Sequence, residues 1–293
     1  MLKFRSPCKE DVALIRPVIS KSGFYGCEFA PASFYIWGEK YKRKLSEFQD
    51  FIFFEVESGY SFPVGGGDLT DALHALLKDS EEKSRPFQMF GVTREGCERM
   101  EACMPGLFSF EPRRDDWDYI YYSQDLAALS GKKYHSKRNH ISKFKRLYSY
   151  VYEDITEENA GECLQMAAIW RDKSHKDGNS SDYVQEFEAI RLALTEKSEL
   201  GLLGGLLRVD GRVIAFTIGE ELNPEVFVLH FEKALTEYEG AYAMINHEFA
   251  SRRLLCYKYI NREEDMGLPG LRKAKLSYHP AFLLEKYTAS LKV

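Results

Sequence analysis

The clearest pattern of apolar and polar positions lies in the second half of the chain, where three apolar runs follow one another. The runs occupy residues 202–208, 213–219 and 226–232. Asp210-Gly211 separates the first two, and an Asp-Gly pair there favours a tight hairpin, because both central residues of the turn take a positive φ. Asn223-Pro224 breaks the second run from the third. The pattern predicts an antiparallel meander of three strands, followed by a helix at about 240–255.

The rest of the second half alternates strands with amphipathic helices. Thr156 is suited to cap a long helix, because Glu157 and Glu158 in its first turn complement the helix dipole. Pro269 favours the first turn of a helix that ends at Leu276. The predicted order is a strand at 150–154, helices at 156–173 and 182–195 with a loop at 175–182 between them, the meander and its helix, a strand at 257–261, a helix at 269–276 and a strand at 281–291.

The first half shows a similar alternation. Asp68 is placed to cap a helix at 68–77, and Pro17 kinks or shortens a helix at 11–19. The three glycines before Asp68 lack the Gly-Lys-Ser/Thr ending of a phosphate-binding loop, so a flexible turn is expected. Further predicted elements are strands at 51–57 and 87–92, a helix at 94–104, and either one long strand or a strand pair at 108–122. The order of elements before residue 148 resembles the order after it, which predicts an α+β protein with domains at 1–148 and 149–293.

Composition and charge narrow the class of protein. The chain has 293 residues, 44% of them hydrophobic and 29% charged, and a net charge of -5. This balance suits two globular domains and excludes a surface that is basic throughout. No apolar run reaches the roughly 18 residues of a membrane span, and the N-terminal residues lack the apolar core of a signal peptide, so we expect a cytoplasmic protein. The six cysteines are scattered without a C-x-x-C pair, which favours reduced thiols and no metal site.

Residues 131–146 form a dense basic segment within this acidic chain. Its basic residues are Lys132, Lys133, Lys137, Arg138, Lys143, Lys145 and Arg146. Ile141, Phe144 and Tyr148 recur at i, i+3 and i+7, so we expect a helix at 134–147 that buries one stripe of side chains.

Three cations of this segment are candidates for binding an anionic partner. Lys137, Arg138 and Lys145 would grip a polyanion such as a tRNA arm, a CoA diphosphate or a phospholipid head group. The alternative is a solvated linker helix, since runs of charge are usually solvated. His135 and His140 are five residues apart and do not share a helical face, which argues against a pair of metal ligands.

The junction between the meander and the following helix is a candidate binding site. Gly240, Ala241, Tyr242 and Ala243 place small residues in the first turn of that helix. The first N–H groups of a helix have no internal partner, and the helix dipole adds positive potential there. A phosphate or carbonyl oxygen of a donor can dock on these amides, provided that no Cβ at position 240 blocks the approach. The alternative is a well-packed corner between strand and helix.

The last part of the chain resembles a known family. Nine residues look like the terminal signature of the phosphatidylglycerol lysyltransferase C-terminal-domain family and its bacterial cytosolic relatives: Asn261, Asp265, Gly267, Gly270, Leu271, Arg272, Lys275, Tyr278 and Pro280. The basic segment is similar to that group as well, through Lys133, Tyr134, His135, Lys137, Arg138 and Asn139. Gly240 matches the acyl-donor loop of the GNAT acyltransferase superfamily, so the resemblance spans residues 131–293.

The resemblance implies a tandem pair of GNAT-like (acyl-CoA N-acyltransferase) domains with mixed, mostly antiparallel sheets, similar to the Fem-type aminoacyl transferases. It implies transfer of an aminoacyl group from aminoacyl-tRNA to an amine or hydroxyl acceptor on a small molecule, a peptide or a lipid head group. Two other functions stay open: an acyl-CoA-dependent N-acyltransferase, and a catalytically silent module that binds a partner or RNA. The tRNA or CoA donor would be a co-substrate, and no tightly bound cofactor is expected.

Such a transfer needs a proton relay, a partner for the oxyanion and an acid for the leaving group. Strict alternation along the third strand of the meander places His230 and Glu232 on one face, where either relays the proton of the acceptor. Tyr278 is a candidate donor to the leaving oxygen, and Arg272 and Lys275 are candidates to neutralise a phosphate or the oxyanion. The alternatives are structural: a buried His–Glu pair that satisfies itself, and a capped terminal helix with surface charges.

Overall fold

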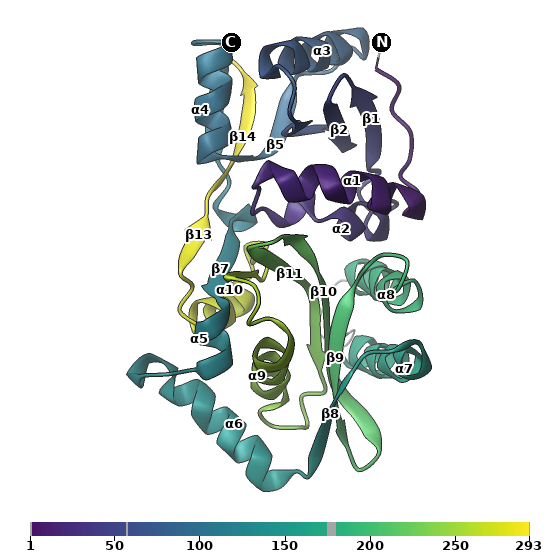
Figure 1. The fold of residues 1–293 in the computed structure, drawn as a ribbon, viewed down its shortest axis with the longest axis vertical. Helices are drawn as coiled ribbons and strands as arrows, with labels where there is room; N and C mark the ends of the chain where they lie inside the picture. The colour runs from purple at the N-terminus through teal and green to yellow at the C-terminus, as the bar shows by residue number, and fades with distance from the viewer. Residues whose placement is uncertain (1, 57, 175–179, 293) are drawn as a thin grey trace. The chain divides into compact units, whose positions relative to one another are not determined.

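The computed structural model describes residues 2–56, 58–174 and 180–292, and the chain divides into two compact units. The first unit comprises Met1–Tyr119, Glu263–Arg272 and Leu283–Val293, and the second comprises Ile120–Arg262 and Lys273–Phe282. This division differs from the boundary expected at residue 148 in two ways: residues 120–148 belong to the second unit, and the chain returns to the first unit near its end. Each unit holds a seven-stranded sheet and helices, which is an α+β architecture (Figure 1).

The sheet of the first unit is mixed. Its strands are β1 (Lys44–Phe48), β2 (Phe51–Val56), β3 (Gly59–Ser61), β4 (Val64–Gly65), β5 (Gln88–Thr93), β6 (Phe108–Pro112) and β14 (Lys286–Leu291). The strand order is β1-β2-β3-β5-β14-β6, with β4 paired to β2. β3 runs parallel to β5, whereas β14 runs antiparallel to both of its neighbours.

The helices of the first unit are α1 (Lys9–Ser22), α2 (Pro31–Ile36), α3 (Leu69–Glu82) and α4 (Arg94–Cys103), with two short 3₁₀ turns, η1 (Cys27–Phe29) and η2 (Arg114–Asp116). These helices include the three that the pattern predicts, α1, α3 and α4. Asp68 caps α3 as expected, since its carboxylate accepts a hydrogen bond of 2.7 Å from the Thr70 N–H. Leu73 and Leu76 of α3 are fully buried. α1 continues through Pro17 to Ser22, so Pro17 does not shorten the helix.

Two stretches that the pattern reads as continuous strands are divided in the structure. Residues 108–122 give β6 in the first sheet and β7 (Asp118–Tyr122) in the second, separated by η2. Residues 281–291 give β13 (Phe282–Leu284) in the second sheet and β14 in the first. Local periodicity does not reveal which sheet a strand joins, because both sheets offer the same hydrogen-bonding groups.

The sheet of the second unit contains the predicted meander. The meander consists of β9 (Leu203–Val209), β10 (Arg212–Asn223) and β11 (Val226–Ala234). Besides β7 and β13, the sheet also contains β8 (Tyr150–Asp154) and β12 (Tyr259–Asn261). The strand order is β13-β7-β12-β11-β10-β9-β8. β9, β10 and β11 are antiparallel, as predicted, and β11 runs parallel to β12.

The Asp210-Gly211 hairpin is confirmed. Both residues take a positive φ, of 48° and 77°, and the register pairs Arg212 with Val209 directly beside the turn. This is the backbone that a two-residue turn requires to match the twist of the flanking strands.

Helices cover both faces of the meander. The helices that follow β7 along the chain are α5 (Ser123–Ala128), α6 (His135–Leu147), α7 (Glu157–Ser174), α8 (Ser180–Thr195), α9 (Ala241–Arg253) and α10 (Pro269–Leu276), with the 3₁₀ turn η3 (Lys132–Tyr134) before α6. Figure 1 shows α9 on one face of β8–β11 and α7 and α8 on the other. The loop predicted at 175–182 falls mainly on residues 175–179, which lie outside the described residues. Throughout the described part of the chain, no helix has the length and apolar character needed to cross a bilayer.

The predicted buried stripe of α6 is confirmed. Ile141 and Phe144 are 7% and 0% exposed. They share a core with Ala241 and Met244 of α9, and Tyr148 packs against its edge. Helix α6 is therefore fixed against α9 instead of lying in solvent as a linker.

Candidate active site

A cluster of polar side chains lies inside the second unit, where β11, β12 and α9 bring together residues that are distant in sequence. The carboxylate of Glu232 accepts one hydrogen bond from Arg262 Nη2 and one from Asn246 Nδ2, each 2.9 Å long. The side chains of Glu232 and Arg262 are each only 13% exposed. A buried charge is tolerated when it is paired and hydrogen-bonded, as it is here.

Tyr278 and Lys137 complete this group, which we call the Glu232 cluster (Lys137, Glu232, Asn246, Arg262 and Tyr278). The Arg262 guanidinium carbon lies 4.7 Å from the centre of the Tyr278 ring, and Lys137 Nζ lies 3.7 Å from the same centre. Both distances are typical of cation–π contacts. Tyr278 is 6% exposed and Lys137 is half-buried. The cluster therefore joins a carboxylate, two cations and a phenol in a largely dry site.

Burial sets the protonation of two members of the cluster. It lowers the pKa of Lys137 to about 8, an effect to which the positive charge of Arg262 adds and which Glu232 opposes. Burial also raises the pKa of Tyr278, although the charge of Arg262 works against the shift. Tyr278 thus remains a protonated hydroxyl at neutral pH, while Lys137 is partly a free amine.

Two atoms of the cluster leave hydrogen-bonding capacity unused. Asn246 Oδ1 and Arg262 Nη1 are buried and have no hydrogen-bond partner among the described residues. Because the amide of Asn246 donates to Glu232 through Nδ2, its oxygen is the atom left without a donor. A buried acceptor and a buried donor without partners are costly, and a bound ligand that supplies both groups would remove that cost.

His230 does not join the cluster, and the prediction that it shares a face with Glu232 is wrong. Phe227 packs against Phe249 of α9, with ring centres 5.9 Å apart, and Glu232 bonds to Asn246 of the same helix. An odd-numbered and an even-numbered residue thus face one helix, because β11 and β10 shift register between Ile218 and Gly219.

His230 instead forms a buried pair on the meander. Its Nε2 lies 3.0 Å from Glu220 Oε1, and the two side chains are 1% and 0% exposed. A buried polar pair of this kind is satisfied internally. It supports the interpretation of His230 as part of the core of the sheet.

The glycine at the start of α9 faces another helix. Gly240 has a φ of 90°, and a Cβ added there would lie 2.5 Å from the carbonyl oxygen of His140 and 3.2 Å from Phe144 Cβ. The expected approach path of a donor is therefore occupied by α6 on that side. Ala241 and Ala243 are buried in the core that α6 and α9 share, and Tyr242 is 37% exposed. Close packing of two helices accounts for the small residues of this turn.

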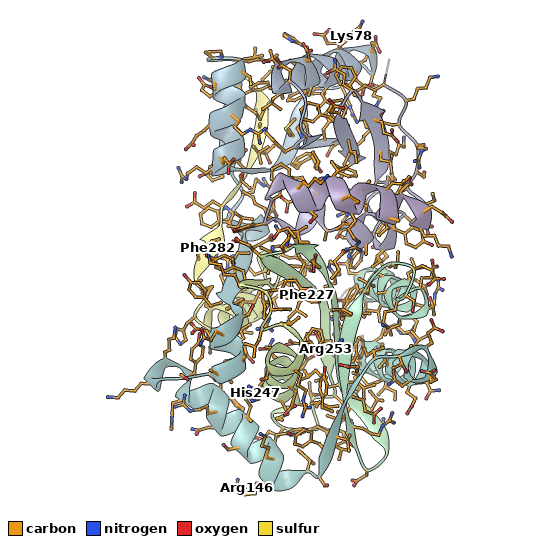
Figure 2. All side chains as sticks on the ribbon, in the orientation of Figure 1. Lys78, Arg146, Phe227, His247, Arg253 and Phe282 are labelled. Atoms are coloured by element: carbon orange, nitrogen blue, oxygen red, sulfur yellow. The ribbon has the colours of Figure 1, made fainter. Side chains whose placement is uncertain are left out.

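The predicted cations of α6 differ in surroundings. Arg138 donates hydrogen bonds to the carbonyl oxygens of Leu129 and Gly131, so it fixes the turn before the helix. Lys145 is exposed, as is Arg146, which Figure 2 shows at the outer end of α6. Lys137 points to Tyr278 instead of outward. Of the three candidates, Lys145 is the one whose surroundings suit contact with a polyanion.

Arg272 and Lys275, the other predicted anion-binding residues, are engaged within their own units. In the first unit, Arg272 bonds to Asp265 at 2.8 Å and to Asp115 at 2.7 Å. In the second unit, Lys275 is 9% exposed and donates a 2.7 Å hydrogen bond to the carbonyl oxygen of Arg262. Lys275 thus fixes the backbone that carries Arg262, and Arg272 belongs to the network of Asp265.

Asp265 is the centre of that network. It is fully buried and accepts hydrogen bonds from Tyr119 and Arg272, and from the Gly267 N–H. Burial alone raises the pKa of Asp265, but the bonds from Arg272, Tyr119 and Gly267 outweigh it and hold the pKa well below its usual range. The tail residues that resemble a family signature thus include a structural network of the first unit.

The first unit also contains a group with metal-ligand chemistry. Cys27, Asp118 and Glu264 offer one sulfur and two carboxylate oxygens within 4.8 Å of one another. Lys286 Nζ lies 2.7 Å from Asp118 Oδ1 and 2.6 Å from Glu28 Oε2. The lysine therefore supplies positive charge to this group, which is a buried ion network of the first unit.

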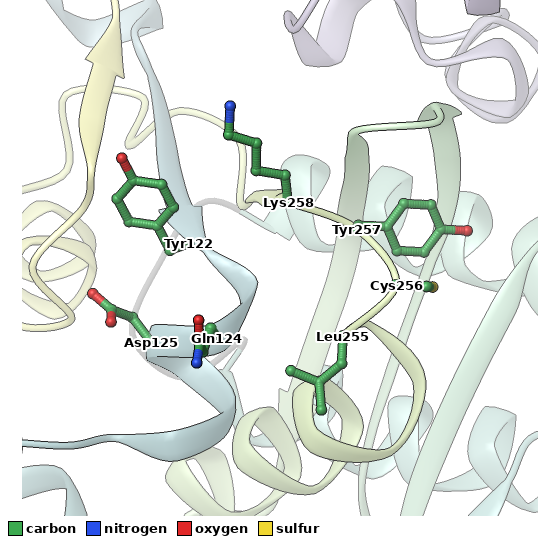
Figure 3. Close-up of a pocket in the computed structure, with 7 residues that line it drawn as sticks. All are labelled: Tyr122, Gln124, Asp125, Leu255, Cys256, Tyr257 and Lys258. Carbon is green, nitrogen blue, oxygen red and sulfur yellow. The ribbon is translucent and has the colours of Figure 1, made fainter.

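A shallow depression of about 560 Å³ lies elsewhere in the second unit (Figure 3). It is lined by Tyr122, Gln124, Asp125, Leu255, Cys256, Tyr257 and Lys258. No member of the Glu232 cluster lines it. In Figure 3 the side chain of Tyr257 points away from Tyr122, so the two rings do not face each other across the depression.

Sequence reasoning missed Asn246 and Arg262. Asn246 stands four residues after Tyr242, in the helical register that faces the sheet, and a buried polar residue in that register indicates a specific partner. Arg262 directly follows β12, at the carboxyl end of a strand parallel to β11. Their hydrogen bonds to Glu232 depend on tertiary contacts, which no local sequence pattern predicts.

The sequence matches a family model. The model is described as phosphatidylglycerol lysyltransferase, C-terminal, and it matches residues 20–290. An uncharacterized protein of Mycoplasmoides gallisepticum is 24% identical over 174 residues, which make up 58% of this chain and 54% of that protein. The match thus spans about half the length of that relative.

Three solved structures are similar along nearly the whole chain. A conserved protein of unknown function from Bacteroides thetaiotaomicron is 41% identical, with a TM-score of 0.95 and 100% of both chains covered. The structure of L-PGS from Bacillus licheniformis is 16% identical, with a TM-score of 0.66, and covers 98% of this chain and 92% of that one. FemX is 10% identical, with a TM-score of 0.59, and covers 99% of this chain and 97% of that one. The last two likenesses concern the fold alone.

Proposed function

The chain belongs to the phosphatidylglycerol lysyltransferase C-terminal family, and on that premise we propose that it transfers an aminoacyl group from aminoacyl-tRNA to an amine or hydroxyl acceptor. The family and the tandem GNAT-like fold that the sequence predicted are both confirmed. The observation that carries the proposal is the Glu232 cluster, a buried ion pair with an unused donor and an unused acceptor. Charged tRNA is a cytoplasmic molecule, so we propose that the reaction takes place there.

Arg262 is the proposed partner of the developing oxyanion. Attack of the acceptor on the ester carbonyl places a negative charge on its oxygen, and a buried guanidinium donor stabilises that charge far better than water does. Arg262 Nη1 is such a donor. Glu232 and Lys275 hold Arg262 by its side chain and its backbone, so the donor is oriented before the substrate arrives.

Tyr278 and Glu232 are the proposed proton carriers. Tyr278 keeps its proton at neutral pH, which suits it to protonate the ribose oxygen that leaves when the ester bond breaks. Glu232 is the carboxylate of the cluster and takes the proton that the acceptor loses. In this assignment the acceptor gains the acyl group and the tRNA regains its hydroxyl. The proton held by Glu232 then returns to the Tyr278 oxygen by way of solvent, which restores the starting protonation of the protein.

Lys145 and Arg146 are proposed to contact the tRNA. Both are exposed on the last turn of α6, in the same unit as the Glu232 cluster. Contacts of lysine and arginine with phosphates supply affinity without sequence preference, and they weaken as salt is added. The interpretation of Gly240–Ala243 as a donor-docking turn is less well supported, because α6 packs against Gly240.

The proposal is tested with purified protein, bulk tRNA charged with radiolabelled amino acids, and labelled acetyl-CoA in a parallel reaction. We expect the wild-type protein to release label from charged tRNA in the presence of amine and hydroxyl acceptors, and Arg262→Gln to lose this activity. Lys132→Gln is a matched control, since Lys132 is exposed and outside the cluster. Use of acetyl-CoA alone would favour the acyl-CoA-dependent alternative. Retention of tRNA without any transfer would favour the silent binding module.

A further inference from the structure

Lys137 differs from the other lysines of the basic segment because its amine lies on a ring of the Glu232 cluster, whereas Lys132 and Lys145 are exposed and Lys133 and Lys143 form ion pairs. Lys133 forms an ion pair with Asp125 at 3.1 Å, and Lys143 pairs with Glu239 at 2.5 Å. Lys137 has no ion pair or hydrogen bond with any residue that the structure describes, and its amine rests on the Tyr278 ring. It is thus an amine in a candidate active site to which the mechanism above gives no role.

The surroundings of Lys137 favour the uncharged amine. The amine has lost water on the side of the Tyr278 ring, and the Arg262 cation contacts the same ring. At pH 7.5, a lysine with a pKa of about 8 is roughly one quarter free amine, whereas an ordinary lysine is about 0.1% free amine. The free amine is the nucleophile, so Lys137 is activated in the way that reactive lysines of enzymes are.

We propose that Lys137 is a site of self-acylation by the activated acyl group that occupies the Glu232 cluster. The inference rests on the proposed function in placing the acyl carbonyl beside Arg262. The Lys137 nitrogen attacks the carbonyl carbon, a C–N bond forms and the C–O bond of the ester breaks. The proton that the nitrogen loses ends on the leaving ribose oxygen, as it does with an external acceptor. A thioester reacts in the same way, with a C–S bond broken and a thiol released.

The product is an amide on Lys137, which does not revert under the conditions of the reaction. The side-chain nitrogen of Lys137 loses its charge and its nucleophilicity, the transferred aminoacyl group brings its own α-amine, and the adduct fills the space above the Tyr278 ring. Acylation therefore occurs when a donor is bound and no acceptor competes for it, and it closes the site to further donors. The acyl classes concerned are aminoacyl esters and thioesters.

The experiment treats the full-length protein with the N-acetylcysteamine thioester of alanine, without an acceptor, and maps acylated lysines by peptide mass spectrometry. Lys145 of the same helix is the internal control, because it is exposed. We expect Lys137 to be acylated at least about tenfold faster than Lys145 at pH 7.5, since its larger fraction of free amine outweighs its lower basicity. The rate at Lys137 should level off above pH 8, whereas the rate of a lysine amine with the ordinary reference pKa of about 10.4 would continue to rise beyond that pH.

Two variants separate reactivity from folding. Lys137→Arg keeps the cation on the ring but cannot form the adduct, and thermal melting shows whether it is folded. Tyr278→Leu removes the ring, so Lys137 should regain water and its acylation should shift to higher pH. Equal rates at Lys137 and Lys145, or a rate at Lys137 that rises to pH 10, would overturn the inference.

A reaction with charged tRNA distinguishes this inference from the proposed function. Transfer to external acceptors without any adduct at Lys137, even when acceptors are withheld, would overturn self-acylation and leave the proposed function intact. If the thioester rapidly acylates Lys137 in a protein that never consumes charged tRNA, self-acylation by thioesters is supported. In that case the proposal that aminoacyl-tRNA is the donor is wrong.

Discussion

Replacement of Gly240 by alanine should destabilise the second unit by about 2–5 kcal/mol. Two effects add. A residue with a Cβ at a φ of 90° is strained by roughly 1–2 kcal/mol. The new Cβ would also lie 2.5 Å from the carbonyl oxygen of His140, and relief of that contact requires α6 to move against α9, which costs about 1–3 kcal/mol as other overpacked sites do.

Gly211 provides a matched control for the backbone effect alone. It lies in the same unit, in the two-residue turn between β9 and β10; its φ is 77°, and nothing lies within 4 Å of a Cβ added there. Gly211→Ala should therefore lose only the conformational part, about 1–2 kcal/mol. Urea unfolding of both variants, followed by circular dichroism and fitted with a common m-value, gives the two free energies of unfolding. Their difference measures the contact between α9 and α6.

Equal losses in the two variants would refute the reasoning. Such a result would mean that α6 yields to a methyl group at no cost, and that Ile141 and Phe144 do not hold it against α9. The approach to Gly240 would then be open, and the result would support the interpretation of this turn as a docking site for the donor.

Four further outcomes are expected. Gly161→Ala on the exposed face of α7, where a Cβ meets nothing within 4 Å, should raise the free energy of unfolding by about 0.5–1 kcal/mol, measured in urea. Asp265→Asn should cost roughly 3–5 kcal/mol at pH 7, because Arg272 and Tyr119 lose a buried carboxylate. The folded-state pKa of Asp265 is depressed, so the stability that its carboxylate contributes is present above the unfolded pKa of about 4 and is lost as pH falls below it. Between pH 6 and pH 2, the free energy of unfolding should therefore fall less steeply for Asp265→Asn than for the wild type. Arg262→Lys should reduce kcat for aminoacyl transfer about 10²–10³-fold while leaving the melting temperature nearly unchanged, and an equal loss of folding would argue against the assigned role. Joint replacement of Lys145 and Arg146 by glutamate should lower the slope of log affinity for tRNA against log salt by about 2, measured by filter binding, and an unchanged slope would exclude both residues from the interface.

Short-range chemistry explains what the sequence could predict. The Asp210-Gly211 turn, the Asp68 cap and the buried stripe of α6 each depend on residues within two turns of helix or one hairpin. Their physical causes act locally, so a pattern of a dozen residues contains them. The family resemblance predicted the overall fold as well, because it compares positions spread over residues 131–293 and not single elements.

The register shift on β11 was not predictable in this way. One extra residue at the bulge reverses the alternation, so that Phe227 and Glu232 face the same helix. The apolar content of the strand is the same with or without the bulge. The shift depends on how β10 and β11 pair, and that pairing is decided by both strands together.

Lys137 shows how charge can mislead. It stands four residues before Ile141 and seven before Phe144, which places it in the buried stripe of α6. Its charge suggested an outward position beside Arg138. Because the lysine side chain is long and mostly apolar, it can follow the stripe and place its amine on an aromatic ring. Periodicity, applied without regard to charge, would have found it.

The position of β14 has a consequence for synthesis on the ribosome. Among the described strands of the first sheet, β6 pairs with β14 alone, and β14 lies between β5 and β6. β14 comes after every strand of the meander of the second unit, β9–β11, so β6 lacks its partner strand while most of the chain is made. The contacts of this meander are local and can form as soon as β11 has emerged, whereas the first sheet closes only over a very long loop. The meander of the second unit is thus expected to form before the first sheet closes, with the edge of β6 exposed to chaperones until β14 has been made.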